Sequence, residues 1–432
     1  MSVAVVLPGG GARGAYEVGA LSTLLPALQA RGERVSIWCG TSVGAINAAA
    51  LASLAHLPAD QQAQQAVAPW EGLRKQHVIA PIVGSGGARM LLRMVGHTLG
   101  LPGVALASVL DPSPLARSVD RWIDWQRLEH NMTTGRVDAV CVVATQLSTG
   151  KPVGFVASHR DVPSQAGNDI RYVKTRLRSE HVRASAAIPV LFPTVEVTAP
   201  RAARGHYTDG GTRLNSPIKP AVDLGADKVI VIGFEPFGRA SEKLAAAGRR
   251  PSIADVAANV LDGLLVDQVA HDLRRVAAIN SFFVESHSTG LIGPPRTYRI
   301  ARGLAPYRPI SYALVAPRRR GEIGRLAETT FKQRYGGLRG MRSIDFAVLA
   351  RTLGAAHRSR GELLSFLLFD EQFIAALIEM GKRDARRWLR RHREFWCREA
   401  EHDLWIEQID RERIKEQQAI DEFRAHRTLR AG

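Results

Sequence analysis

The N-terminal part of the chain alternates short apolar runs with turns that contain glycine and with stretches of helical character. Residues 3–7 form a continuous apolar run, as expected of a strand buried on both faces, and residues 35–39 form a second expected strand. Helices are expected over residues 15–30 and 45–57. Strands separated by helical crossovers in this way lie parallel in one sheet. The sequence therefore predicts an α/β fold of three layers, α/β/α, around a mainly parallel central sheet.

Further elements of the same kind follow along the chain. The remaining expected strands are 138–146, 205–208, 228–234 and 310–315, and the remaining expected helices include 90–95, 119–128, 179–187 and 251–279. We expect one α/β domain over residues 1–316, interrupted at 58–135 by a helical insertion that is a candidate lid. Residues 317–432 are expected to form a basic, helical C-terminal extension.

The chain carries a formal net charge of +17, with 58 basic and 41 acidic residues. Such a charge favours contact with phospholipid head groups, nucleic acid or anionic substrates, although a solvated arginine-rich surface is an equal alternative. The basic run 382–393, with Trp388 and Trp396, could lie on an anionic membrane or form a solvated helix that packs against the α/β domain. No nucleic-acid-binding motif is found, so no nucleic-acid partner is expected. The sequence does not indicate an oligomeric state.

Three scattered cysteines suit a reducing compartment better than a disulfide framework. The apolar residues 2–7 run directly into a glycine-rich turn and lack the basic segment of a signal peptide. No apolar stretch reaches the roughly 18 residues that a membrane span needs, and residues 44–57 come nearest. We expect a cytoplasmic protein, with peripheral membrane contact as an open alternative.

The sharpest local pattern is Gly-Thr-Ser-Val-Gly at residues 40–44, a G-x-S-x-G sequence between an expected strand and an expected helix. A nucleophile elbow requires this context, because the serine occupies a strained turn at the top of the sheet. Side chains at Gly40 and Gly44 would clash with the neighbouring strand and helix. The pattern predicts that the Ser42 hydroxyl projects from the top of the sheet as a nucleophile, with backbone N–H groups beside it.

A second glycine-rich segment, Gly9 to Gly14, follows the first expected strand. Residues without a Cβ leave backbone N–H groups free to converge on an anion, which suits an oxyanion hole for acyl transfer. The segment also satisfies the dinucleotide pattern G-x-G-x-x-G, but the second strand ends in the serine turn rather than in an acidic residue. An oxyanion hole, a dinucleotide site and a tight turn without a ligand are all compatible with the loop.

A third pattern is Asp209-Gly210-Gly211, directly after the short expected strand at 205–208. An aspartate followed by two glycines is commonly a turn. Its interest comes from its combination with the other two motifs.

Together, the Gly-Gly-Gly-x-Arg-Gly loop, the G-x-S-x-G turn and the distal Asp-Gly-Gly resemble the patatin-like phospholipase family, in particular its bacterial type. The resemblance covers residues 1–235, including matching pieces at 185–189, 192–193 and 215–217. Residues 363–389 resemble the C-terminal region of bacterial members less specifically. The resemblance implies the patatin-like α/β/α fold and a serine hydrolase acting on phospholipid, lysophospholipid or related lipid esters.

The resemblance also implies roles for individual residues. Ser42 would be the nucleophile and Asp209 the base that activates it, as a dyad without histidine. The N–H groups of Gly10, Gly11 and Ala12 would form the oxyanion hole, with Arg13 nearby. The glycines that support the motifs are Gly9, Gly14, Gly40, Gly44, Gly210 and Gly211. No cofactor is implied, and no metal-ligand spacing is found, so hydrolysis is expected to be independent of metal.

Three alternatives remain open at this stage. A Ser-His-Asp triad would need a histidine, and the candidates along the chain are His206, His271, His287 and His357. A nucleotide-binding oxidoreductase would use the loop of residues 9–14. A catalytically silent scaffold would keep the fold without the chemistry.

Overall fold

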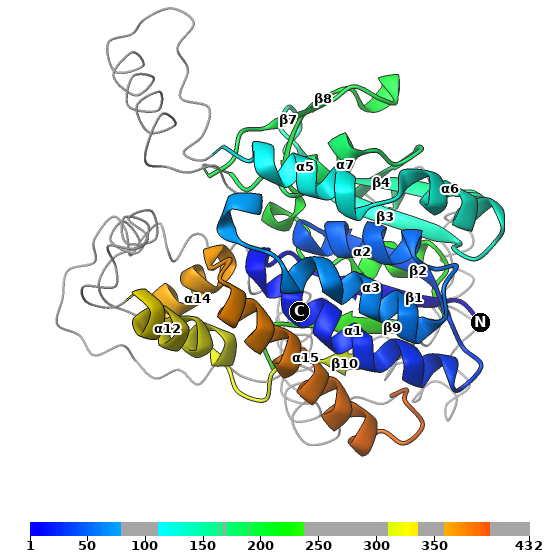
Figure 1. Ribbon diagram of the computed structural model, residues 1–432. Coiled ribbons are helices and arrows are strands. Elements are labelled where there is room, and N and C mark those ends of the chain that lie inside the picture. Colours follow the sequence, from blue (N-terminus) through cyan, green and yellow to red (C-terminus); the bar gives the residue numbers. More distant parts are fainter. Residues whose placement is uncertain are drawn as a thin grey trace, which may run out of the picture.

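The computed structural model describes residues 1–78, 111–163, 165–166, 170–189, 191–236, 310–335 and 358–397. These residues form a ten-stranded sheet with the order β10-β9-β1-β2-β3-β4-β6-β5, while β8 pairs with β3 and β7 (Figure 1). The strands are β1 (Val3–Leu7), β2 (Val35–Thr41), β3 (Ala139–Gln146), β4 (Pro152–Ser158), β5 (Gln165–Ala166), β6 (Ile170–Lys174), β7 (Val195–Val197), β8 (Gly205–Asp209), β9 (Lys228–Ile232) and β10 (Ser311–Val315).

The sheet is mixed and mostly parallel. Strands β10, β9, β1, β2 and β3 run parallel to one another, and β4 and β6 form a further parallel pair. Antiparallel pairing begins at β3, which pairs with both β4 and β8. The expected α/β fold with a mainly parallel sheet is confirmed. Strand β8, which pairs antiparallel with the end of β3, ends at Asp209.

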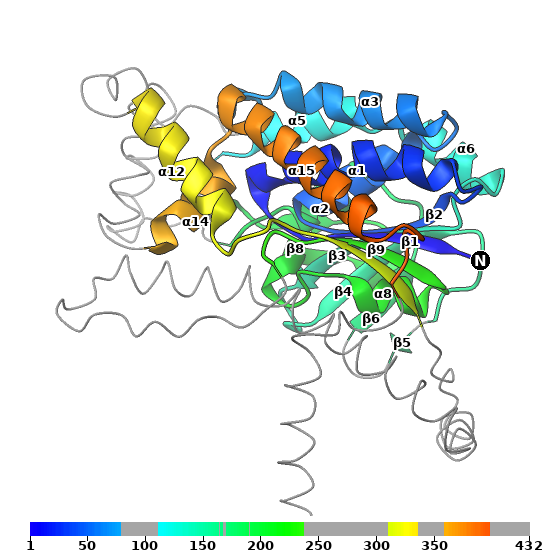
Figure 2. The same cartoon turned by 90° about the horizontal axis from the view of Figure 1, so that it is seen from below.

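Both faces of the parallel strands are buried. In β1, Val3, Val5 and Leu7 belong to one apolar cluster, whereas Ala4 and Val6 belong to a second. Figure 2 shows helices α1 (Gly14–Gln29), α2 (Val43–Ser53), α3 (Ala59–Glu71) and α15 (Glu371–Arg391) on one side of the sheet, and α8 (Ile218–Asp223) on the other. Burial on both faces explains why the strand sequences are continuously apolar.

The remaining helices differ from expectation in one place. They are α5 (Ser113–Trp122), α6 (Trp125–Thr133), α7 (Ser179–Ser185), α12 (Glu322–Tyr335) and α14 (Arg358–Leu367). The single helix expected over 119–128 is wrong, because two helices meet there. Asp124 caps the second one by accepting the Arg127 N–H at 2.8 Å. The helices expected at 90–95 and 251–279 lie outside the described residues.

The C-terminal helix α15 packs closely along α1 (Figure 1). A Cβ on Gly381 would lie 2.2 Å from the Tyr16 carbonyl oxygen, and one on Gly19 would lie 2.3 Å from the Ile378 carbonyl oxygen. The buried Asp384 accepts a hydrogen bond of 3.2 Å from the Tyr16 hydroxyl. Residues beyond the expected boundary at 316 therefore pack against the first helix of the chain. None of the described helices is long and apolar enough to cross a membrane.

Candidate active site

Ser42 stands between the end of β2 and the start of α2. Its φ of 55° and ψ of −125° lie in a region that residues with a side chain rarely occupy. The Ser42 N–H donates to the Ser185 hydroxyl at 2.8 Å, and that hydroxyl in turn donates to the Val143 carbonyl. The strained turn is thus held by a hydrogen-bonded link to β3.

The two glycines of the turn are required by close backbone contacts. A Cβ on Gly40 would lie 2.2 Å from the Gly44 carbonyl oxygen. A Cβ on Gly44 would lie 2.2 Å from the Leu7 carbonyl oxygen, at the end of β1. The predicted elbow between strand and helix has this geometry, with α2 beginning at Val43, directly after the serine.

Asp209 reaches the same edge of the sheet through β3. Thr41 of β2 pairs with Val143, and Asp209 of β8 pairs with Ala144 on the same side of β3, because β4 occupies the other side. Because these partners are adjacent residues of β3, the ends of β2 and β8 come together. A tight turn follows, in which the Gly211 N–H donates to Asp209 Oδ1 at 2.7 Å.

The Asp209 carboxyl group is completely buried and lies beside the Ser42 hydroxyl. Burial raises the pKa of Asp209 to about 6, and the nearby Ser42 hydroxyl and the Gly211 N–H partly oppose this rise because they favour the ionised form. Oδ2 makes no hydrogen bond of normal geometry within the described part of the chain, so the contact with Ser42 is looser than a fully formed hydrogen bond. Such contacts often tighten when a substrate binds.

The glycine-rich loop lies against the serine turn. The Gly9 N–H donates to Asn215 Oδ1 at 2.9 Å, and a Cβ on Gly9 would come within 2.9 Å of the Ser42 Cβ. The loop continues into a short 3₁₀ helix, η1 (Gly11–Arg13), and then into α1. Within the described chain, no hydrogen bond occupies the N–H groups of Gly10, Gly11 and Ala12. The loop therefore leaves three N–H groups free beside Ser42.

The resemblance places Arg13 near the oxyanion hole, but its backbone N–H and its guanidinium group bind other parts of the chain. Its N–H donates to the Gly10 carbonyl at 3.1 Å and is not free. Its side chain is only 1% exposed and is turned toward α14, where it pairs with the Glu362 carboxylate and donates to the Ser365 hydroxyl at 2.7 Å. The arginine thus connects the loop to the C-terminal helices.

The other motif glycines lie in close contacts around the same site. Gly14 faces Val43 and Trp70, and a Cβ on Gly210 would lie 2.2 Å from the Val143 carbonyl oxygen. A Cβ on Gly10 would lie 2.5 Å from the Phe234 ring. The three motifs, which are distant in the sequence, are therefore adjacent in space.

A cavity of about 40 Å³ lies over Ser42 and Gly11. Apart from the serine hydroxyl, its lining is apolar and comes from α2, α3, α5, α14 and the segments around Val78, Ala186 and Phe192. The apolar side chains include Val43, Ile46, Trp70, Leu73, Leu115, Trp122, Ile188, Phe366, Leu367 and Phe369. Part of the expected insertion at 58–135 thus forms a wall of this cavity, while residues 79–110 lie outside the described chain.

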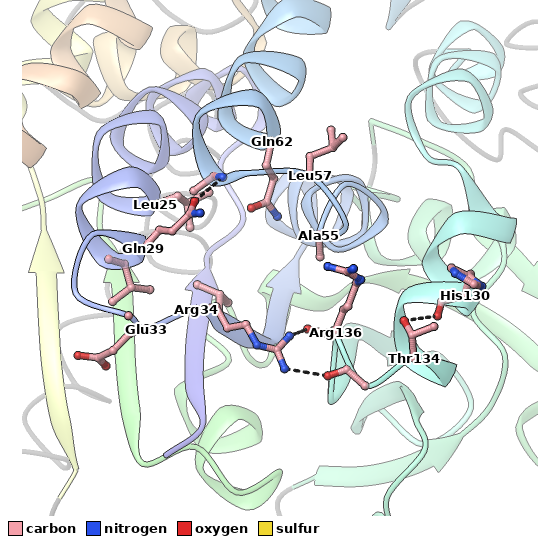
Figure 3. Close-up of a pocket in the computed structure, with 15 residues that line it drawn as sticks. Leu25, Gln29, Glu33, Arg34, Ala55, Leu57, Gln62, His130, Thr134 and Arg136 are labelled. Carbon is pink, nitrogen blue, oxygen red and sulfur yellow. Dashed lines mark hydrogen bonds between the residues drawn. The ribbon is translucent and has the colours of Figure 1, made fainter.

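A larger hollow of about 680 Å³ lies at the opposite edge of the sheet, near the start of β2 (Figure 3). Arg34, which lines this hollow, donates hydrogen bonds to the carbonyl oxygens of Gly135 and Arg136, at 2.9 and 2.6 Å. Since Ser42 follows the other end of β2, this hollow is separate from the serine site.

The histidine candidates do not join Ser42 and Asp209 in the described structure. His206 is exposed on β8, where its backbone lies opposite that of Glu196 in the neighbouring strand β7. The other three candidates, His271, His287 and His357, lie outside the described residues. Among the residues that the structure describes, no group of three or more His, Cys, Asp or Glu could hold a metal ion.

Sequence reasoning assigned no role to several residues of the site. Ser185 and Asn215, which hold Ser42 and Gly9, lie in two of the matching family pieces, so their position in those pieces was an available signal. Glu362 and Ser365, which bind Arg13, carry no local signal that links them to the glycine loop.

Comparison with known proteins identifies a family. A family model described as patatin-like phospholipase matches residues 5–222. No curated protein matches the chain. Among solved structures, VipD from Legionella pneumophila is 15% identical, and the match covers 90% of this chain and 67% of VipD with a TM-score of 0.34. One chain of the heterodimeric ExoU–SpcU complex from the type III secretion system of Pseudomonas aeruginosa is 14% identical, with coverage of 85% and 74% and a TM-score of 0.24.

Proposed function

Because the chain belongs to the patatin-like phospholipase family, we propose that it is a lipid hydrolase that cleaves phospholipid, lysophospholipid or related acyl esters through a Ser42–Asp209 dyad. The observation that carries the proposal is the strained Ser42 beside a buried carboxyl group and beside three free N–H groups. The bacterial type of the family remains a prediction from the sequence.

Asp209 has the properties of a general base in this mechanism. Burial raises its pKa to about 6, so at neutral pH the carboxylate is ionised and is a stronger base than an ordinary aspartate. It would take the Ser42 hydroxyl proton as Oγ attacks the ester carbonyl carbon. The proton then passes to the leaving alcohol oxygen as the ester bond breaks, which leaves an acyl group on Ser42.

Water completes the cycle with the same groups. Asp209 would take a proton from the water whose oxygen attacks the acyl carbon, and the Ser42 oxygen regains that proton as the fatty acid leaves. In both steps negative charge develops on the carbonyl oxygen. The free N–H groups of Gly10, Gly11 and Ala12, at the N-terminal end of η1 and α1, are suited to stabilise it.

The cavity over Ser42 supports a substrate with an apolar acyl part, because apolar side chains line it. Its volume of about 40 Å³ is too small for a long acyl chain, since an apolar cavity of about 150 Å³ holds a molecule only the size of benzene. We therefore keep the lid role of the insertion at 58–135 as a proposal. The wall formed by the described part of this insertion would have to move for a long acyl chain.

We also propose a peripheral contact with an anionic membrane through the outer face of α15. Arg386, Arg390 and Arg391 are exposed there. The Trp388 indole is not part of this face, because it is buried and donates to the Phe395 carbonyl at 2.9 Å. Trp396 likewise donates to Glu33 at 3.0 Å. Binding to vesicles containing phosphatidylserine should weaken as salt is raised and when the three arginines are replaced by glutamine.

A cytoplasmic location also remains a prediction, and cell fractionation would check it. No nucleic-acid partner and no cofactor are proposed.

A fluorophosphonate probe tests the proposed activity directly, because it reacts with activated serines. Wild-type protein should be labelled at Ser42, and Ser42→Ala should not be labelled. Quenching of NADPH fluorescence without labelling would favour the oxidoreductase alternative. Absence of both signals from folded protein would favour a silent scaffold.

A further inference from the structure

Helix α14, which precedes α15 in the chain, touches the glycine-rich loop. Gly11 has a φ of 57°, and a Cβ there would lie 2.2 Å from the Phe366 carbonyl oxygen. Phe366 and Leu367 also line the cavity over Ser42. A segment far along the chain from the serine and aspartate motifs therefore forms one side of the site.

The strongest link between the two segments is the buried Arg13. Its Nε donates to the Ser365 hydroxyl at 2.7 Å, and a terminal nitrogen donates to the Glu362 carbonyl at 2.9 Å and pairs with the Glu362 carboxylate. The guanidinium also lies 4.1 Å from the centre of the Phe366 ring. An arginine fork held on several sides has a nearly fixed position, because each bond constrains a different N–H.

This fixed side chain determines where the loop can lie. The Arg13 N–H closes the turn on the Gly10 carbonyl at 3.1 Å, so the backbone of residues 10–13 moves with Arg13. On the other side, Asn215 holds Gly9 against Ser42. The loop is thus held at one end by the serine turn and at the other end by α14.

We propose that Arg13 is a positioning residue, which uses Glu362 and Ser365 of α14 to hold the Gly10–Ala12 N–H groups in register with Ser42. The inference rests on the proposed function, since those N–H groups are the proposed oxyanion hole. It follows that residues 5–222, which match the family model, are not sufficient for full activity without α14.

The test replaces partners of Arg13 that do not line the cavity. Glu362→Gln removes the charge partner, and Ser365→Ala removes one hydrogen bond. The matched control is Glu379→Gln, which removes the same charge from an exposed pair with Lys382 on α15. Turnover of p-nitrophenyl butyrate is expressed per active serine, titrated with a fluorophosphonate, so that misfolded protein does not lower kcat.

In Glu362→Gln, kcat per active serine should fall by about tenfold or more, because a small displacement of oxyanion donors has a large effect on rate. KM should change by less than about threefold, since the donors act mainly in the transition state. Ser365→Ala should shift kcat in the same direction by a smaller factor, and it replaces Glu362→Gln if that variant is insoluble. If kcat in both variants equals that of the Glu379→Gln control, the proposal is overturned.

Amide hydrogen exchange gives a second readout that does not require activity. Peptides covering residues 9–14 should exchange faster in Glu362→Gln than in wild-type protein, and the control should be unchanged. Unchanged exchange in the loop would overturn the positioning role. Absence of turnover and labelling in the wild-type protein would instead contradict the proposed function, so the two failures are distinguishable.

Discussion

Gly9 of the first loop packs so closely against Ser42 of the serine turn that a Cβ on Gly9 would lie only 2.9 Å from the Ser42 Cβ. The Gly9 N–H is at the same time bound to Asn215, six residues after Asp209. The three motifs therefore form one packed unit rather than three separate turns. The predictions below follow from that unit and from the groups packed around it.

The serine turn should not tolerate a side chain at Gly44. Gly44→Ala would place a Cβ 2.2 Å from the Leu7 carbonyl oxygen, so either β1 or α2 must shift. We expect loss of soluble protein or a fall in melting temperature of several degrees. Gly72→Ala is the matched control, since nothing lies within 4 Å of its Cβ and its φ is −91°. Equal melting temperatures for the two variants would contradict the observed packing.

The rate of ester hydrolysis should depend on the protonation of Asp209. Burial raises the pKa of this carboxyl group to about 6, and only the ionised form can accept the serine proton. Below that pH, kcat/KM should fall about tenfold for each pH unit, and above it kcat/KM should be level. Rates measured from pH 4.5 to 8 would check this. An acid limb near pH 4 would indicate an ordinary solvated carboxylate.

Glu17 on α1 should make the protein less stable as the pH rises. Its side chain is fully buried, and burial raises the pKa of Glu17 well above its usual value, although a hydrogen bond of 2.7 Å from Asn47 lowers it. Above about pH 4.5 the unfolded chain releases this proton and the folded chain keeps it, so folding is progressively disfavoured. Glu17→Gln has no proton to release.

The free energy of unfolding of Glu17→Gln, measured relative to wild type, should therefore increase from pH 5 to pH 8. The increase is at most about 1.4 kcal/mol for each pH unit, and it stops at the folded-state pKa. Urea unfolding at several pH values measures it. Glu379→Gln controls for loss of an exposed carboxylate. A difference that is constant with pH would show that Glu17 is ionised in the folded protein.

The cavity over Ser42 should limit acyl chain length. Leu115 of α5 is part of its wall, and Leu115→Ala should enlarge the cavity. We expect the ratio of kcat/KM for p-nitrophenyl hexanoate over acetate to rise about tenfold, with a loss of about 2–4 kcal/mol in stability. Leu28→Ala is the matched control, because Leu28 is a buried residue of α1 that lies beside the larger hollow and away from Ser42. It should lose similar stability without changing the ratio of kcat/KM for hexanoate over acetate. The same ratio in both variants would place the acyl group elsewhere.

The strands and the serine turn could be predicted because their signals are local. Strands β1, β3 and β9 are continuous apolar runs, and burial on both faces explains that pattern. The elbow around Ser42 follows from two glycines that have no room for a side chain. The adjacency of Asp209 came only from the family resemblance, since it depends on the pairing of β8 with β3.

Other features could not be read from local patterns. The break between α5 and α6 depends on one capping aspartate, Asp124, within an otherwise amphipathic stretch. The partners of Arg13 lie on α14, and no spacing rule connects residues so far apart. For the same reason, the sequence could not tell whether Arg13 faces a substrate anion or a protein carboxylate.

The most direct test of the account is the turnover of a short p-nitrophenyl ester by Asp209→Asn, with Ser42→Ala as reference for background. The variant keeps the size of the side chain and removes its ability to accept the serine proton. We predict a fall in kcat of at least about a hundredfold, with a circular dichroism spectrum like that of the wild type. Full activity in folded Asp209→Asn would contradict the Ser42–Asp209 dyad.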